Sequence, residues 1–212
     1  MKVCAARAAA ALALILGFLV GDSLTDREPG IAVAEPLNFA SADSSPFGDD
    51  ASPWSHRVPY SDSRLPVELV IRELDIAADV RPVGMTDTTT MQVPSDISVV
   101  GWFDDSVLPI STAGNTVLVG HRDGVEDPNG VFRRLGDLQE GDLVEVEDLS
   151  QQRLEYEVTR VDVIGRDEFA GEAPWIFNRI GKHHLVLLTC GGSYDASRGG
   201  YQANVIVVAK RT

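Results

Sequence analysis

Cysteine, basic side chains and long hydrophobic stretches are all scarce in this sequence of 212 residues. Its two cysteines are Cys4 and Cys190, so a disulfide framework is excluded beyond the first few residues. Lys and Arg number 18 against 32 Asp and Glu, and the formal net charge of -14 argues against binding to nucleic acid or to an anionic membrane surface. With 44% hydrophobic residues, the chain can bury the core of one ordinary domain.

The most extended hydrophobic run occupies residues 8–20 and follows Lys2 and Arg7. This order is typical of a secretory signal or a short N-terminal membrane anchor. About 13 helical residues rise only about 20 Å, short of a bilayer core of about 30 Å, which is compatible with a cleaved signal. The small-x-small pattern at residues 32–34 lies too far beyond the run for a usual cleavage site, so we favour an uncleaved anchor with its basic residues in the cytoplasm.

Composition divides the rest of the chain in two. After an anchor at residues 1–21, residues 22–60 are rich in Ser, Asp, Ala and Pro, which is typical of a flexible linker. Trp54 within it is either an ordinary linker residue or an anchor that docks on the folded domain. Residues 61–212 alternate short aliphatic runs with turn residues, which predicts an all-β barrel or sandwich with one or two short helices. The expected strands are residues 67–74, 80–83, 115–120, 142–147, 154–163, 184–190 and 204–209, with helical turns at 131–138 and 167–169.

Cys190 is the first candidate for a reactive side chain. It ends the aliphatic run at residues 184–190 and precedes Gly191 and Gly192, so it lies at the mouth of a predicted buried strand. A lone thiol in this position is either an inert buried side chain or a nucleophile. A nucleophilic thiol needs a base or a cation within reach, which directs attention to the histidines and arginines.

Among the four histidines, strand geometry favours His121 as the partner. His183 and His184 precede the strand that ends at Cys190, and six extended residues span about 20 Å. His56 lies in the linker. His121 ends a second aliphatic strand, and two strand ends of this kind can meet.

Arg198 is the candidate cation. It lies in the segment that joins the Cys190 strand to the final strand, and a hairpin connection would bring its guanidinium back over the strand ends. There it could donate hydrogen bonds to a developing oxyanion. Arg211 follows the final strand and is expected at the far end of the barrel. The alternative for either arginine is an ordinary solvated side chain.

Several motifs in chain order resemble the sortase family of cysteine transpeptidases, over nearly all of residues 66–210. The family hallmark is Thr-Leu-x-Thr-Cys, and residues 186–190 read Val-Leu-Leu-Thr-Cys, which match it at all but the first position. Residues 117–121, Val-Leu-Val-Gly-His, resemble the strand that enters the family's catalytic loop. They are followed by Val131, Phe132 and Leu135 and by Gly-Asp-Leu-Val at residues 141–144.

Other segments are similar to the class E and class F members from actinobacteria. They are Val-Pro at residues 93–94, Val-Gly-Trp-Phe at 100–103, and Cys-Gly-Gly at 190–192 with Tyr201 and Asn204 before the last strand. Where relatives carry Pro-Gly before the histidine strand, residues 108–114 read Leu-Pro-Ile-Ser-Thr-Ala-Gly, so the shape of that loop stays open.

The resemblance implies an eight-stranded sortase-type β-barrel in which Cys190, His121 and Arg198 carry catalysis and Thr189 orients substrate or supports the site. The Cys190 thiolate would attack the carbonyl after threonine in a Leu-Pro-x-Thr-Gly-like sorting signal, and an amine would resolve the resulting thioester. His121 would protonate the leaving amine while Arg198 holds the oxyanion. From the pKa values of free cysteine and histidine, about 1% of molecules at pH 7 would hold a thiolate–imidazolium pair.

The implied partners are surface proteins that bear a C-terminal sorting signal and an amine acceptor, such as a cell-wall precursor or a pilin lysine. The catalytic domain would lie outside the cell, held at the membrane by the N-terminal segment. No cofactor is expected. Four side chains that could bind calcium crowd one loop, but their spacing misses the EF-hand pattern, so no metal is expected. They are Asp123, Glu126, Asp127 and Asn129.

Two alternatives remain on sequence grounds. An L,D-transpeptidase of the cell wall also uses one catalytic cysteine, but that family typically shows Ser-x-Gly-Cys followed closely by Arg, which residues 188–191 lack. A non-enzymatic tethered β-domain that binds a surface polymer would leave Cys190 as an inert buried thiol.

Overall fold

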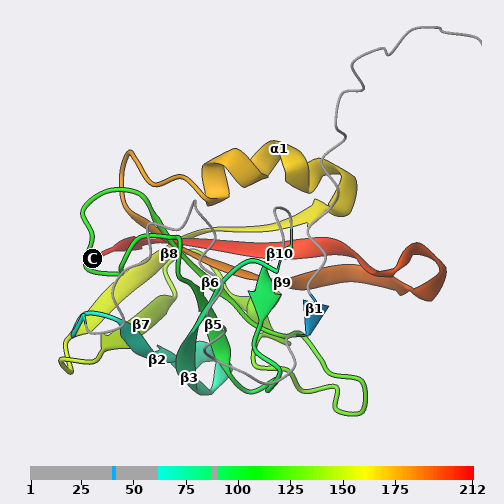
Figure 1. Cartoon of the computed structure of the whole chain (residues 1–212), viewed down its shortest axis with the longest axis horizontal. Helices are drawn as coiled ribbons and strands as arrows, with labels where there is room; N and C mark the ends of the chain where they lie inside the picture. Colours follow the sequence, from blue (N-terminus) through cyan, green and yellow to red (C-terminus); the bar gives the residue numbers. More distant parts are fainter. Residues whose placement is uncertain (1–39, 42–61, 87–89) are drawn as a thin grey trace, which may run out of the picture. The chain divides into compact units, whose positions relative to one another are not determined.

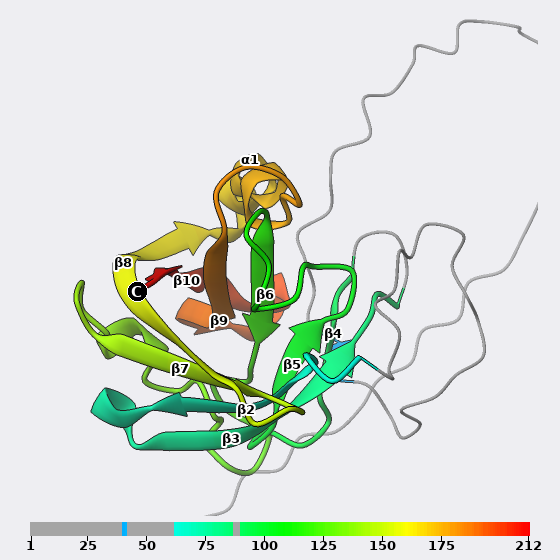
Figure 2. The ribbon, with the colours of Figure 1, turned by 90° about the vertical axis from the view of Figure 1, so that its left-hand side faces the viewer.

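A closed barrel of eight strands forms the body of the domain (Figures 1 and 2). The computed structural model describes residues 40–41, 62–86 and 90–212. Around the barrel the strands follow the order β10-β8-β7-β2-β3-β5-β6-β9. Their bounds are β2 (Pro66–Ile71), β3 (Ile76–Val83), β5 (Val100–Phe103), β6 (Asn115–Val119), β7 (Leu143–Asp148), β8 (Arg153–Gly165), β9 (His184–Asp195) and β10 (Gly200–Arg211).

The prediction of an eight-stranded all-β barrel is confirmed. The predicted anchor and almost all of the predicted linker, including Trp54 and His56, lie outside the described residues. Within the part of the chain that is described, no helix has both the length and the apolar character that a membrane crossing requires.

Shorter elements surround the barrel. Strand β1 (Ala40–Ser41) pairs in parallel with β4 (Gln92–Val93) as a separate two-stranded sheet. Helix α1 (Arg166–Ile176) follows β8 and packs beside β10 (Figures 1 and 2). Single 3₁₀ turns occupy Arg72–Leu74, Leu135–Asp137 and Ala196–Arg198.

Helix α1 is longer than the turn expected at residues 167–169. Gly171 and Pro174, both poor helix formers, lie inside it and obscure the pattern. Its buried residues are Phe169 and Ile176, which pack on the outer face of the barrel sheet, so tertiary packing stabilises the helix. Strand β5 was not expected because its four residues are all buried and show no alternation.

Strand β9 also runs further than predicted. It was expected to end at Cys190 but continues to Asp195 and forms a hairpin with β10. The pairing shifts by a bulge next to Gly191 and Gly192, and Gly192 adopts a φ of 71° that favours glycine. The glycine pair therefore marks a bulge inside a continuing strand, and the strand does not stop there.

The core has two layers that alternate along the strands. Leu185 and Leu187 of β9 point into the barrel interior, whereas Val186 and Leu188 point outward into a second cluster that includes residues of α1. The same period of two continues toward the end of the strand and decides which face each later side chain occupies.

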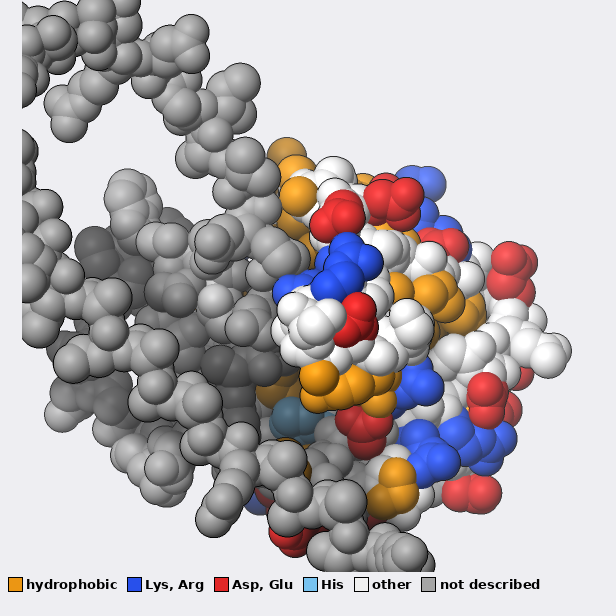
Figure 3. Space-filling view, turned by 90° about the vertical axis from the view of Figure 1, so that its right-hand side faces the viewer, with side chains coloured by type: hydrophobic (Ala, Val, Ile, Leu, Met, Phe, Trp, Pro, Cys, Tyr) orange, Lys and Arg blue, Asp and Glu red, His pale blue; other side chains and the backbone are white. Residues whose placement is uncertain are grey.

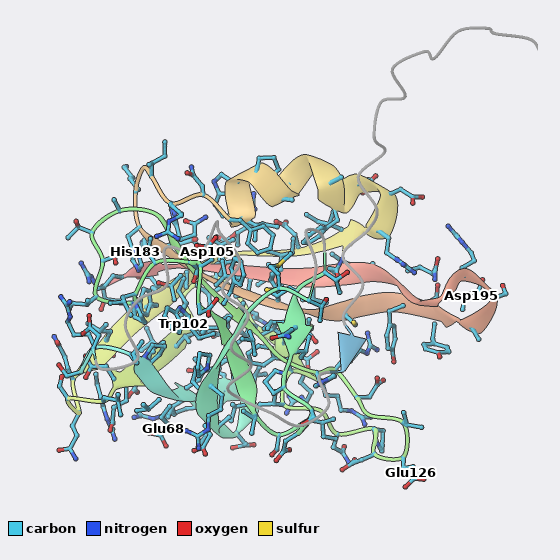
Figure 4. The ribbon with its side chains drawn as sticks, in the orientation of Figure 1. Glu68, Trp102, Asp105, Glu126, His183 and Asp195 are labelled. Carbon is cyan, nitrogen blue, oxygen red and sulfur yellow. The ribbon has the colours of Figure 1, made fainter. Side chains whose placement is uncertain are left out.

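His183 lies at the end of the barrel opposite the hairpin tip that Asp195 marks (Figure 4). The Tyr156 hydroxyl donates to the Pro109 carbonyl at 2.7 Å, so the hydroxyl accepts from His183 Nε2 at 3.1 Å. Burial, together with the charge of Arg211, lowers the pKa of His183 to about 4. The imidazole is therefore neutral in the folded protein at neutral pH.

We expect acid to destabilise the fold through His183. Its pKa in the folded state lies below the unfolded value of about 6.5, so the unfolded state binds the extra proton between these values. The free energy of unfolding should fall as pH drops from about 6.5 toward 4. Urea titrations across this range should show a smaller fall for His183→Gln than for the wild-type protein, and equal falls would contradict the assignment.

Candidate active site

Cys190 and His121 come together because β6 and β9 are parallel neighbours. Their register places Val119 opposite Leu188, and the Gly120 amide donates to the Leu188 carbonyl at 3.1 Å. One residue further, the Thr189 hydroxyl donates to the Gly120 carbonyl at 2.8 Å. The next residues are His121, just past the end of β6, and Cys190, which lies within β9 beside that end.

Cys190 lies on the outer face of the sheet, because it follows Leu188 of the outer cluster by two residues within β9. His121 follows Val119 of the same cluster by two residues, past the end of β6. On the other side of β9, Asn204 of β10 lies directly opposite Cys190. The end of β6 meets β9 next to Cys190, although β9 itself does not end there, and the catalytic roles of the two residues stay predictions.

Thr189 occupies the inner face and is 1% exposed. Its hydroxyl donates a hydrogen bond to the Gly120 carbonyl inside the protein. Of the two roles considered for Thr189, this contact corresponds to support of the site, because a buried side chain offers little surface to a substrate.

The Cys190 thiol is free, partly exposed and neutral at rest. Burial and, to a smaller extent, the Asp123 carboxylate raise its pKa to about 11, although Arg122 and Arg166 act in the opposite direction. At pH 7 only about one molecule in ten thousand would carry the thiolate, against about 3% for a free cysteine. The reactive form is therefore a very small fraction in the substrate-free protein.

A backbone carbonyl holds the His121 ring. His121 Nε2 lies 2.8 Å from the Pro94 carbonyl oxygen, and since a carbonyl only accepts, Nε2 must carry the hydrogen. In the neutral ring the lone pair is then on Nδ1, which is the atom able to exchange a proton with a reacting group.

The loop after His121 folds back on itself and closes against the histidine. The Phe132 amide donates to the His121 carbonyl at 2.8 Å, and the Gly130 amide donates to the Arg122 carbonyl at 3.1 Å. A Cβ atom on Gly130 would lie 2.4 Å from the His121 carbonyl oxygen. Only glycine allows this close backbone approach, so the loop returns tightly against the histidine.

The structure does not bring Arg198 to Cys190. Arg198 is exposed in the 3₁₀ turn at the hairpin tip, where Figure 4 labels the adjacent Asp195. Strand β9 continues for five residues beyond Cys190, which corresponds to at most about 17 Å of extended chain. The expectation that the turn folds back over the thiol is wrong, because it assumed that β9 ends at Cys190. The catalytic role of Arg198 stays a prediction.

Sequence reasoning missed the cations that do act on the thiol. Arg122 follows His121, and Arg166 begins α1, with its Nη1 donating to the Arg198 carbonyl at 2.9 Å. No spacing pattern distinguishes these two arginines from solvated ones. Tyr201 was noted only as part of a motif; its hydroxyl donates to Asp123.

The remaining candidates lie away from Cys190, as predicted. His184 begins β9 and its Nδ1 is 3.2 Å from the Asn115 amide oxygen, while Arg211 Nη1 donates to the Ile110 carbonyl at 3.2 Å. In the acidic loop, Asp127 Oδ1 accepts from the backbone and side-chain amides of Asn129. Among the described residues, no group of three His, Cys, Asp or Glu is arranged to hold a metal ion.

Comparison with protein families gives a match to the family described as Sortase domain, over residues 69–212. The chain belongs to the sortase family. Its members are cysteine transpeptidases, which decides against the L,D-transpeptidase and binding-module alternatives. A comparison with curated protein sequences found no match.

Solved sortase structures share the barrel fold. Sortase C-1 from Actinomyces oris has a TM-score of 0.51 and 23% identity, over 69% of this chain and 72% of that one. Sortase C1 of GBS pilus island 1 has a TM-score of 0.52 and 19% identity, over 69% and 63%. Sortase A from Corynebacterium diphtheriae has a TM-score of 0.53 and 19% identity, over 72% and 63%. These are class C and class A enzymes, and the finer resemblance to classes E and F stays a prediction.

Alkylation of this sortase should report the raised pKa of Cys190. In full-length protein with Cys4→Ser, the iodoacetamide reaction should be slow at pH 7 and should still accelerate above pH 9, because the thiolate forms only near pH 11. A rate that levels off at or below the ordinary cysteine pKa of about 8.5 would contradict the burial effect. Cys190→Ala supplies the background rate.

Gly130→Ala should displace the histidine of the sortase site. The added methyl group would meet the His121 carbonyl oxygen, and a displacement of about 1 Å near reacting groups can cost about 100-fold in rate. Gly136→Ala is the matched control, because its Cβ would meet only Val205 at an ordinary 3.7 Å. We expect kcat/KM to fall for Gly130→Ala in protein that remains folded by circular dichroism. Equal activity of the two variants would contradict this role of the loop.

Proposed function

We propose that this sortase cleaves a Leu-Pro-x-Thr-Gly-like sorting signal after threonine and transfers the new acyl end to an amine. The observation that carries the proposal is the parallel pairing of β6 and β9, which places His121, just past the end of β6, beside the part of β9 that holds Cys190. The family match supports the same chemistry.

In the first step Cys190 Sγ forms a bond to the threonine carbonyl carbon, and the carbonyl electron pair moves to oxygen. Collapse of this intermediate breaks the C–N bond. His121 donates a proton to the departing amine, and the acyl group remains on Cys190 as a thioester. An incoming amine attacks the thioester, His121 removes its proton, and the thiolate leaves.

The protonation states of the two residues must change before attack. The resting protein holds a neutral thiol, raised in pKa by burial, beside an imidazole whose Nδ1 is free to accept a proton. Transfer of the thiol proton to His121 creates the thiolate and the general acid together, so the two groups titrate as a pair.

The substrates we propose are surface proteins with a C-terminal sorting signal, and the acceptor is an amine of a cell-wall precursor or a pilin lysine. A pilus-island sortase among the similar structures supports the pilin alternative. We also propose that the domain acts outside the cell, anchored by residues 1–21. The apolar run after Lys2 and Arg7 supports this location.

The test is a panel of Leu-Pro-x-Thr-Gly and Leu-Ala-x-Thr-Gly peptides, incubated with the protein in the presence and absence of amines. We expect cleavage after threonine, a peptide–amine product when an amine is present, and a covalent peptide adduct on Cys190 by mass spectrometry. Cys190→Ala should abolish both products, and His121→Gln should lower kcat by about 100- to 10,000-fold. Cleavage that survives Cys190→Ala would refute the proposal.

A further inference from the structure

Arg122 is held in place beside the site by an aromatic ring. Its guanidinium carbon lies 5.0 Å from the centroid of the Tyr201 ring, within the range of a cation–π contact. Among the ion pairs formed by the described residues, none includes Arg122. Its N–H groups are therefore not committed to a described carboxylate.

Tyr201 connects this arginine to the strand pair that carries the nucleophile. It lies on β10 three residues before Asn204, the residue opposite Cys190. Its hydroxyl donates to Asp123, and its ring packs edge-on against Tyr194 with centroids 5.2 Å apart. The loop that begins at His121 is thereby fixed to the β9–β10 hairpin at two consecutive residues, Arg122 and Asp123.

Charges of both signs face the thiol from this arrangement. Asp123 raises the pKa of Cys190, whereas Arg122 and Arg166 lower it. Figure 3 views the side on which the hairpin projects, and there basic and acidic side chains stand together beside a hydrophobic band. Because Tyr201 donates to the Asp123 carboxylate, that carboxylate has a partner other than Arg122.

The other two arginines are less suited to the reacting atoms. Arg166 donates to the Arg198 carbonyl, which ties its guanidinium to the hairpin turn. Arg198 itself is exposed at the tip of the hairpin, about 17 Å of strand beyond Cys190.

We infer that Arg122, and not Arg198, supplies the guanidinium that stabilises the anionic groups formed at Cys190, and that Tyr201 and Asp123 position it. This inference rests on the proposed cysteine chemistry. When Cys190 Sγ bonds to the substrate carbonyl carbon, the electron pair displaced onto oxygen accepts hydrogen bonds from Arg122. The contact weakens when the C–N bond breaks and the carbonyl re-forms, so it favours the intermediate over the bound substrate.

The experiment compares three matched variants of the full chain, Arg122→Gln, Arg166→Gln and Arg198→Gln, in two assays. The first assay is the pH profile of Cys190 alkylation in a Cys4→Ser background. The second is kcat and KM for the peptide that the wild-type protein cleaves.

We expect Arg122→Gln to slow alkylation at a fixed pH by about 3- to 10-fold, because the thiol pKa rises when a nearby positive charge is lost. The same variant should lower kcat by about 100- to 1,000-fold with little change in KM. Arg198→Gln should stay within about threefold of wild type in kcat, whereas Arg166→Gln removes the other cation that lowers the thiol pKa and should slow alkylation without the large loss of kcat expected for Arg122→Gln. A large loss of kcat in either of these two, with activity retained in Arg122→Gln, would overturn the inference.

Three further variants distinguish a chemical role of Arg122 from an effect on folding. Arg122→Lys keeps the charge but loses the planar guanidinium, so its alkylation profile should match wild type while kcat falls. Tyr201→Leu removes the ring beneath Arg122 and should change the alkylation profile in the same direction as Arg122→Gln, whereas Tyr194→Leu should leave the profile unchanged. Equal profiles for the two tyrosine variants would overturn the positioning role of Tyr201.

The two assays also distinguish failure of the inference from failure of the proposed function. If the wild-type protein cleaves none of the peptides, the proposed function fails, and the alkylation profiles still report whether Arg122 acts on the thiol. If the wild-type protein is active and Arg122→Gln leaves both assays unchanged, the inference alone fails.

Discussion

A hydrogen bond inside the barrel, from the Thr189 hydroxyl to the Gly120 carbonyl, fixes the arrangement on the outer face. It continues the parallel pairing of β6 and β9 by one residue, after the ladder of backbone hydrogen bonds has ended. Such a bond contributes only about 1 kcal/mol, but breaking it leaves a buried carbonyl unsatisfied. His121 and Cys190 follow directly, so a slip of either strand would separate the thiol from the imidazole.

The burial that orders the site also disfavours the reactive thiolate form of Cys190. Cys190 lies at the edge of an aliphatic cluster, which raises its thiol pKa to about 11. The protein offsets this cost with cations near the thiol and with a histidine whose Nε2 is fixed by the Pro94 carbonyl. A neutral resting thiol is less open to oxidation and alkylation than a thiolate. Reactivity then depends on proton transfer to His121.

Much of this arrangement could be predicted from the sequence, because strands and their ends have clear signals. The aliphatic runs before His121 and Cys190 predicted two buried strands that can meet, and the end of β6 does lie beside Cys190, although β9 continues past it. The length of the hairpin could not be predicted, since Gly191 and Gly192 are equally typical of a turn and of a bulge. Because of this ambiguity, Arg198 was expected near the thiol, whereas the structure has it at the hairpin tip. Arg122 gave no signal, because its significance depends on the ring of Tyr201, which is 79 residues away in the chain.

The most direct test of the strand-end geometry is disulfide trapping between positions 121 and 190. In a Cys4→Ser background, a His121→Cys variant should form a disulfide with Cys190 on oxidation. The preceding residues, Gly120 and Thr189, are joined by a hydrogen bond, and a disulfide requires Cα atoms about 4.4–6.8 Å apart. An Arg198→Cys variant treated in the same way should keep both thiols free. Rapid crosslinking of position 198 and none of position 121, in folded protein, would contradict the account.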